Sequence, residues 1–207
     1  DKEKLVKVKK EAKVTVGAVN FGDMFSDIVK GTVDKLKVQP FLDKVNLPYN
    51  TLVFLDDSGS MVSNGNKERT FTAFDFANFI ATICLMKNPD ENAKDLLGYF
   101  SRECRMFTHI NQKATSPNSI VSVARQTANE PFIKPELHFL ENLQRVRAFS
   151  KAVQTGNGTN IGDIPMYLDR WAKGDLNNIE QLQQFPVWTI ISDGNWNSMS
   201  SPEASMN

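Results

Sequence analysis

The sequence contains only two cysteines and two histidines among 207 residues, and neither type is arranged for metal or catalytic chemistry. Cys84 and Cys104 lack the close paired spacing of a zinc site. We therefore expect both thiols to be reduced and buried, as suits a cytoplasmic protein, with a virion-associated location as the alternative. His109 and His138 adjoin no other candidate catalytic group, so we expect each to be a hydrogen-bonded or solvated side chain.

The sequence also lacks a long apolar run and an excess of either charge. No stretch approaches the roughly 20 apolar residues of a membrane-spanning helix, and no signal peptide is recognisable, so we expect no membrane partner. The formal net charge is zero, which argues against a chain-wide basic field for nucleic acid. Lysines do gather in residues 1–13, where a solvated helix face or tail is expected and an RNA contact is the alternative.

Three common enzyme signatures are missing as well. The chain has neither the Gly-x-x-x-x-Gly-Lys-Ser/Thr loop of nucleotide-binding proteins nor a Gly-x-Ser-x-Gly nucleophile elbow. A phosphatase of the haloacid dehalogenase type needs a second carboxylate two residues after its nucleophilic aspartate, but Ser58 occupies that position after Asp56. We therefore predict a protein that is not an enzyme and has no small-molecule substrate.

The most informative segment that is present joins an apolar run to a cluster of oxygen-bearing side chains. Residues 52–55 predict a short buried strand, and Asp56, Ser58 and Ser60 follow it with a glycine between the serines. One carboxylate and two hydroxyls converging on a point suit a hard cation, Mg²⁺ or alternatively Mn²⁺. An Asx turn or serine cap without a metal is the other interpretation of this segment.

Two later segments supply the remaining oxygen ligands. Thr159 lies in the Gly-rich loop 154–160, just before a helix predicted over 161–173, and Asp193 follows a second predicted buried strand over 186–192. Ligands of open α/β sheets bind at the carboxyl ends of the strands, so both segments should reach the edge where the first strand ends. The predicted metal ligands are Asp56, Ser58, Ser60, Thr159 and Asp193.

With these residues in this order, the chain resembles the von Willebrand factor A-type (vWA) domain and its metal-ion-dependent adhesion site (MIDAS). The resemblance covers residues 50 to about 200. It implies an α/β, Rossmann-like, mostly parallel sheet with helices on both faces, and a metal site whose open position accepts an Asp or Glu of a partner protein. The implied function is that of a divalent-metal-dependent protein-binding module. Asp57 would be the variable position of the motif and point away from the metal.

The intervening segments predict the order of elements. Helices are expected over 69–85, capped by Thr70 or Thr72, and over 137–153. Residues 96–100 and 104–107 predict an antiparallel edge hairpin, and 111–135 a polar, irregular surface insertion. Residues 1–48 are expected to be a basic segment and a helix, 24–38, that Pro40 ends; residues 49–207 form the vWA-like domain.

Two further expectations come from the resemblance. A vWA domain continues past the position of Asp193 through two more strands and two helices, so we expect the C-terminal strands to be missing from this chain. A helix directly before the Asp-x-Ser-x-Ser strand is also similar to the Ro ribonucleoprotein (TROVE) group, which makes an RNA–protein scaffold the alternative function. A structural component of a large intracellular or viral assembly, with the metal serving stability only, is a third interpretation.

The surroundings of the predicted ligands leave several roles open. Asn160 and Asp163 could cap the helix expected at 161 or orient the ligands, and Asn195 could also contribute to that orientation. Trp196 is expected either to offer an apolar contact to a partner beside the metal or to pack within the domain.

Overall fold

The computed structural model describes residues 21–63, 71–93, 96–107, 132–156, 158–174 and 176–194. The remaining positions include several that carry expectations from the sequence. The basic segment 1–13, most of the insertion 111–135, His109, Asn195 and Trp196 lie outside the described residues.

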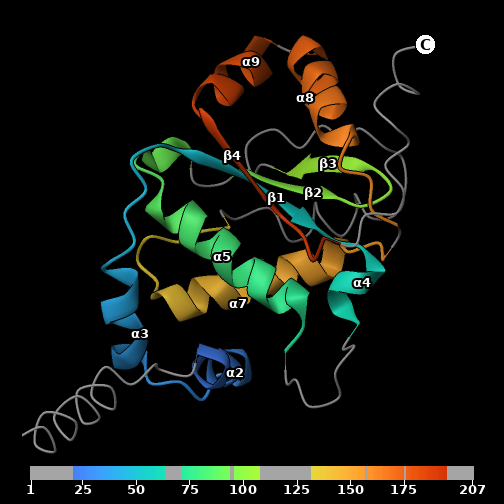
Figure 1. Ribbon diagram of the computed structural model, residues 1–207. Helices are drawn as coiled ribbons and strands as arrows, with labels where there is room; N and C mark the ends of the chain where they lie inside the picture. Colours follow the sequence, from blue (N-terminus) through green and yellow to red (C-terminus); the bar gives the residue numbers. More distant parts are fainter. Residues whose placement is uncertain are drawn as a thin grey trace, which may run out of the picture.

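The described strands form one mixed sheet in the order β3-β2-β1-β4 (Figure 1). These strands are β1 (Thr51–Asp56), β2 (Leu97–Phe100), β3 (Cys104–Phe107) and β4 (Val187–Ile191). Strand β1 pairs in parallel with both β2 and β4, and β3 returns antiparallel beside β2. The α/β fold class and the antiparallel edge hairpin expected from the sequence are confirmed.

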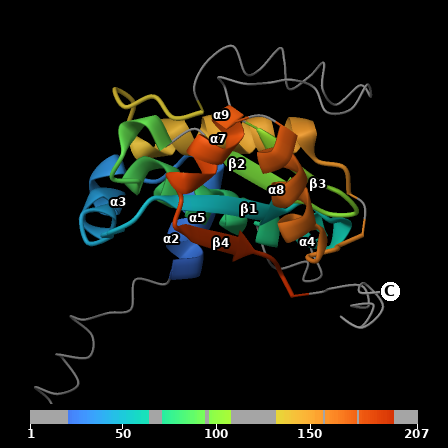
Figure 2. The same cartoon turned by 90° about the horizontal axis from the view of Figure 1, so that it is seen from above.

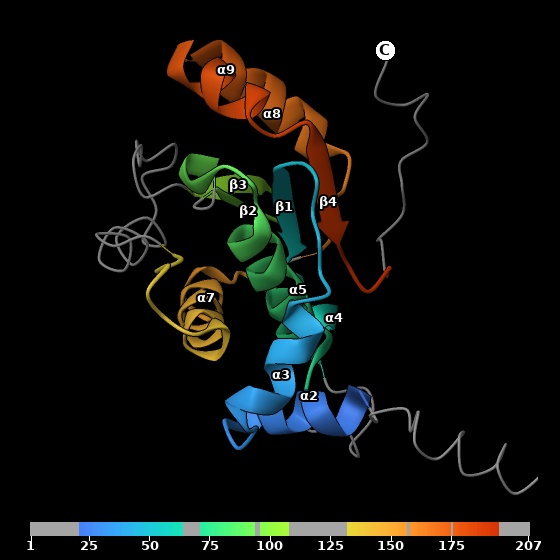
Figure 3. The ribbon, with the colours of Figure 1, turned by 90° about the vertical axis from the view of Figure 1, so that its left-hand side faces the viewer.

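Helices cover both faces of this sheet because β1 is apolar on both sides. Val53 and Leu55 pack with α5 (Ala73–Lys87) and α7 (Phe139–Val153), whereas Leu52 and Phe54 pack with α8 (Asp163–Gly174) and α9 (Leu176–Gln183). Figure 3 shows the sheet between these two helical layers. All six residues of β1 are buried, as its continuous apolar run predicts for a central strand.

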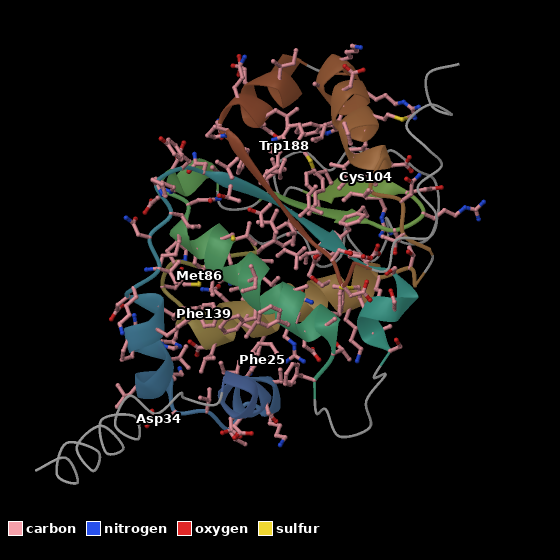
Figure 4. The ribbon with its side chains drawn as sticks, viewed as in Figure 1. Phe25, Asp34, Met86, Cys104, Phe139 and Trp188 are labelled. Carbon is pink, nitrogen blue, oxygen red and sulfur yellow. The ribbon has the colours of Figure 1, made fainter. Side chains whose placement is uncertain are left out.

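A further layer of two helices, α2 (Phe21–Lys30) and α3 (Lys35–Leu42), packs on the outer side of α5 and α7. Phe25 of α2 and Phe139 of α7, both labelled in Figure 4, each pack against Phe79 of α5 in an edge-on geometry, with ring centroids 5.2 and 5.3 Å away. Such aromatic pairs contribute about 0.5–1.5 kcal/mol each beyond the area they bury.

The expectation of one helix over 24–38 is wrong, because the segment breaks at Gly31. That glycine has a φ of 72°, a left-handed conformation that ends α2 and that side chains disfavour. The side chain of Asp34 then caps α3 by accepting a hydrogen bond from Leu36 N. Pro40 lies inside α3 and does not end the helix, which runs on to Leu42.

The other helix starts follow their capping residues. Thr72 and Asp75 form a reciprocal capping box at the start of α5, which confirms Thr72 as the cap. His138 caps α7 by accepting a hydrogen bond from Leu140 N, so it is a hydrogen-bonded histidine as expected. Helix α8 begins at Asp163, and α9 was not predicted. Two short helical turns, α4 (Gly59–Val62) and η1 (Glu91–Ala93), follow β1 and α5.

Two burial expectations are corrected. Strand β4 is not buried: Val187, Trp188 and Ile190 are 38%, 48% and 41% exposed. Within the described part of the chain β4 pairs only with β1, and Figure 2 shows it on the outer side of that strand. The end of the predicted insertion is not polar surface either, since Phe132 and Ile133 are buried in the core between the sheet and α7.

The described helices include none that combines the length and apolar character needed to cross a bilayer.

Candidate metal site

The carboxylate of Asp56 is fully buried at the carboxyl end of β1, where hydrogen bonds hold both of its oxygens. Oδ1 accepts from the backbone N–H of Ser58 at 2.9 Å, the contact of an Asx turn. Oδ2 accepts from the hydroxyl of Ser192 at 2.7 Å. Asp56 therefore ties the end of its own strand to the residue that follows β4.

The two serines of the motif lie at the start of α4, with their hydroxyls together. Ser58 is the N-cap residue of that helical turn, but its side chain makes no capping bond. Its Oγ is instead 3.0 Å from Oγ of Ser60. Two oxygens on neighbouring corners of an Mg²⁺ octahedron with metal–oxygen distances of about 2.1 Å would lie about 3.0 Å apart. The hydroxyl pair therefore has the spacing that adjacent Mg²⁺ ligands need.

The loop that carries Thr159 lies directly against these serines. Ser58 and Gly156 form an isolated parallel β-bridge. A Cβ added to Gly59 would lie 3.1 Å from the carbonyl oxygen of Gly156, so the two glycine-containing segments approach more closely than larger residues would allow. Thr159, three positions further along, is buried. The glycine between Ser58 and Ser60 thus has a packing reason.

Asn160 forms an Asx turn directly before α8. Its side-chain oxygen accepts from Gly162 N at 3.2 Å, and its amide donates to Asp163 Oδ1 at 2.9 Å. The two side chains are therefore bonded to each other in the turn that leads into α8, whose first residue is Asp163.

The segment after β4 reaches the same edge through Ser192, whose hydroxyl also accepts from Gly194 N at 3.1 Å. Asp193, the residue between them, is exposed. The structure therefore brings Asp56, Ser58 and Ser60 together directly. It joins the segments of Thr159 and Asp193 to them through Gly156 and Ser192.

Asp57, the residue next to Asp56, is also fully buried and belongs to a separate set of contacts. Its Oδ2 forms an ion pair with Arg105 Nη2 and accepts from Thr155 N at 3.2 Å. Burial raises the pKa of Asp57 above its ordinary value, although the charge of Arg105 counteracts part of that shift. The expectation that Asp57 turns away from the Asp56–Ser58–Ser60 oxygens agrees with its pairing to Arg105.

Sequence reasoning missed Ser192, Arg105 and Thr155 as residues that organise this edge of the sheet. Ser192 had a usable signal, since it directly precedes Asp193. Arg105 had none, because its ion pair joins residues 48 positions apart.

The donor set is dominated by hydroxyls. Among the residues that the structure describes, no group of three or more His, Cys, Asp or Glu side chains could hold a metal. The predicted set has only two carboxylates beside its three hydroxyls, a combination of oxygen donors that fits a hard, partly hydrated cation.

Comparison of the chain with family models, curated proteins and solved structures found no match. The resemblance to the vWA domain therefore stays a prediction that rests on the motif residues.

Proposed function

We propose that this chain is a divalent-metal-dependent protein-binding module with a MIDAS-type site for Mg²⁺, or alternatively Mn²⁺. The observation that carries the proposal is the pair of hydroxyls of Ser58 and Ser60, 3.0 Å apart beside the buried carboxylate of Asp56. Their chemistry and spacing suit neighbouring positions around Mg²⁺.

The proposed binding chemistry follows from the small negative charge of the ligands. Hydroxyls of Ser58, Ser60 and Thr159 are neutral, so an ion held mainly by them keeps most of its positive charge. Such an ion attracts an incoming carboxylate, which is why the proposed partner is a protein that presents an Asp or Glu. Asp193 is exposed beside this edge and would share the ion with the arriving group.

The experiment that tests the metal site is thermal unfolding of the protein with Mg²⁺, Mn²⁺ or EDTA. An ion that binds only the folded state stabilises it by about 2.7 kcal/mol at a hundred times its Kd. We expect a metal-dependent rise in Tm for the wild type and none for Asp56→Ala. Asp75→Ala is the matched control, since it removes a partly buried carboxylate that caps α5; it should lower Tm yet keep the rise. Equal midpoints with Mg²⁺, Mn²⁺ and EDTA for the wild type contradict the proposal.

Partner binding needs a second test. An array of peptides in matched Glu and Gln versions, probed with the protein in Mg²⁺ and again in EDTA, separates metal-bridged capture from other binding. We expect signals that need both the carboxylate and the metal. If the metal raises Tm while no peptide depends on either, the metal serves stability alone and the protein-binding proposal is wrong.

A further inference from the structure

The buried ion pair between Asp57 and Arg105 joins three elements beside the proposed metal site. Asp57 directly follows β1, and Arg105 lies in the middle of β3 with its side chain only 17% exposed. Arg105 also donates through Nη1 to the carbonyl of Val153, the last residue of α7, at 3.2 Å. The residue pair therefore fixes the point at which the chain leaves α7.

The loop that leaves α7 is the one that carries Thr159, and it is attached at both ends. At its start, Thr155 N donates to the Asp57 carboxylate, and Gly156 N donates to the Asp57 carbonyl at 3.3 Å. Near its end, Asn160 N donates to the carbonyl of Ser101 at 2.6 Å. Thr159 lies between these attachments.

Ser101 connects the two ends of the loop, because its hydroxyl is hydrogen-bonded to that of Thr155 at 2.9 Å. The loop contains two glycines, Gly156 and Gly158, and glycine adds conformational freedom that contacts must remove. The contacts of Asp57, Arg105 and Ser101 restrict this freedom.

We propose that Asp57 and Arg105 are positioning residues that hold the loop of Thr159 against the segment of Ser58 and Ser60, and so set the affinity for the divalent ion. This inference rests on the proposed metal site. Loss of Arg105 leaves a buried carboxylate without its counter-charge, which strongly destabilises the arrangement of groups around it. Thr155 N donates to that carboxylate, so a shift of the Asp57 side chain would displace the segment that begins at Thr155 and carries Thr159.

The test is calorimetric titration of Mg²⁺, and separately Mn²⁺, into the full chain and three variants. Arg105→Leu should weaken Mg²⁺ binding at least about tenfold, the effect typical of groups that orient metal ligands. Arg105→Lys keeps the charge but not the guanidinium fork, so its affinity for Mg²⁺ should lie between those of the wild type and Arg105→Leu.

Arg147→Leu is the matched control. Arg147 also forms a partly buried ion pair, with Asp75, and its side chain is 27% exposed. Its bonds join α5, α7 and the carbonyl of Val29 in α2. Its loss should lower Tm while the Kd for Mg²⁺ stays within about twofold of wild type, as for independent sites.

The outcomes separate the two proposals. If the wild type binds neither ion, the proposed metal site itself is wrong. If the wild type binds Mg²⁺ and Arg105→Leu binds it as tightly, the positioning role is overturned, whatever happens to Tm. If circular dichroism shows that Arg105→Leu is unfolded, the Mg²⁺ affinity of Arg105→Lys tests the positioning role instead. An affinity equal to that of the wild type contradicts the proposal. A weaker affinity, with unchanged Mg²⁺ binding in Arg147→Leu, supports it.

Discussion

The hydroxyl of Ser192 donates to the carboxylate of Asp56 at 2.7 Å and joins residues 136 positions apart. Asp56 ends the central strand, and Ser192 directly follows the strand beside it. A hydrogen bond to a carboxylate is stronger than one between neutral groups, and this carboxylate is fully buried. The contact therefore holds the ends of two parallel strands together at the edge where the proposed metal site lies.

Replacing Ser192 with alanine removes that hydrogen bond, so Oδ2 of the buried Asp56 carboxylate loses this donor. We expect Ser192→Ala to lower the free energy of unfolding by about 1.5–3 kcal/mol, the usual range for a hydrogen bond to a charged group. Urea denaturation in EDTA measures this loss without any contribution from metal. Ser63→Ala, which removes an exposed hydroxyl near α4, should change stability by less than about 0.5 kcal/mol. Equal losses for the two substitutions would show that the Ser192 hydrogen bond stabilises the protein no more than that of an exposed hydroxyl.

Asn142 offers a second test of a buried polar contact, at the start of α7. Its amide is fully buried, accepts from Lys134 N at 2.8 Å, and donates to the carbonyls of Lys134 and Leu137 at 3.0 and 3.3 Å. Asn142→Ala should lower the free energy of unfolding by about 2–4 kcal/mol, because several partly buried backbone groups lose their partner at once. Guanidinium denaturation is the measurement. Substitution of the exposed Gln144 on the same helix with alanine is the control and should change the free energy of unfolding little. A loss below about 1 kcal/mol for Asn142→Ala contradicts the expected role of its hydrogen bonds.

The sequence predicted best those features that depend on local pattern. The unbroken apolar run before Asp56 identified a central strand, and the short connection between β2 and β3 identified the hairpin. Thr72 was one of two threonines expected as the cap of α5, because a hydroxyl oxygen is favoured at the N-cap. The grouping of Asp56, Ser58 and Ser60 followed from spacing alone.

Features that depend on distant partners could not be predicted in the same way. The apolar residues of β4 resemble those of a central strand, and only the absence of a second neighbour among the described strands explains why Trp188 is half exposed. The apolar periodicity of residues 24–38 continues across Gly31, so the pattern did not reveal the break there. Arg105 gave no local sign that it would pair with Asp57.

The two cysteine thiols provide a pH-dependent prediction. Burial raises the pKa of Cys84 to about 11 and that of Cys104 to about 12, from an ordinary value of 9.0. Because the thiolate is the reactive form, both thiols should react slowly with a disulfide reagent at pH 8 in the native protein and rapidly in urea. Fast labelling of either thiol under native conditions contradicts their burial.

The same shifts predict how stability changes in alkali. Between pH 9 and about 11 the unfolded chain releases thiol protons that the folded chain retains, so the free energy of unfolding should fall as the pH rises. Replacing Cys84 and Cys104 with alanine removes this contribution. The double variant should therefore show a shallower alkaline decline in urea denaturation than the wild type, and identical slopes would argue against the shifts.

Gly98 and Phe54, which are register partners on β2 and β1, fit closely against each other. A Cβ added to Gly98 would lie 2.3 Å from two ring atoms of Phe54, far inside van der Waals contact. The ring is fully buried between the sheet and α8, so it has no free space to move into. Gly98→Ala should therefore lower the free energy of unfolding by about 1–3 kcal/mol through overpacking.

A double-mutant cycle tests whether the ring is the cause. Phe54→Leu alone should destabilise the protein because it leaves unfilled space in the core. In the double variant the smaller leucine makes room for the new methyl group, so the loss should be less than the sum of the two single losses by more than about 0.5 kcal/mol. Additive losses would instead place the cost of Gly98→Ala in the backbone of β2. A favourable coupling would show that β2 has a glycine at this position because the neighbouring strand fills the space with an aromatic ring.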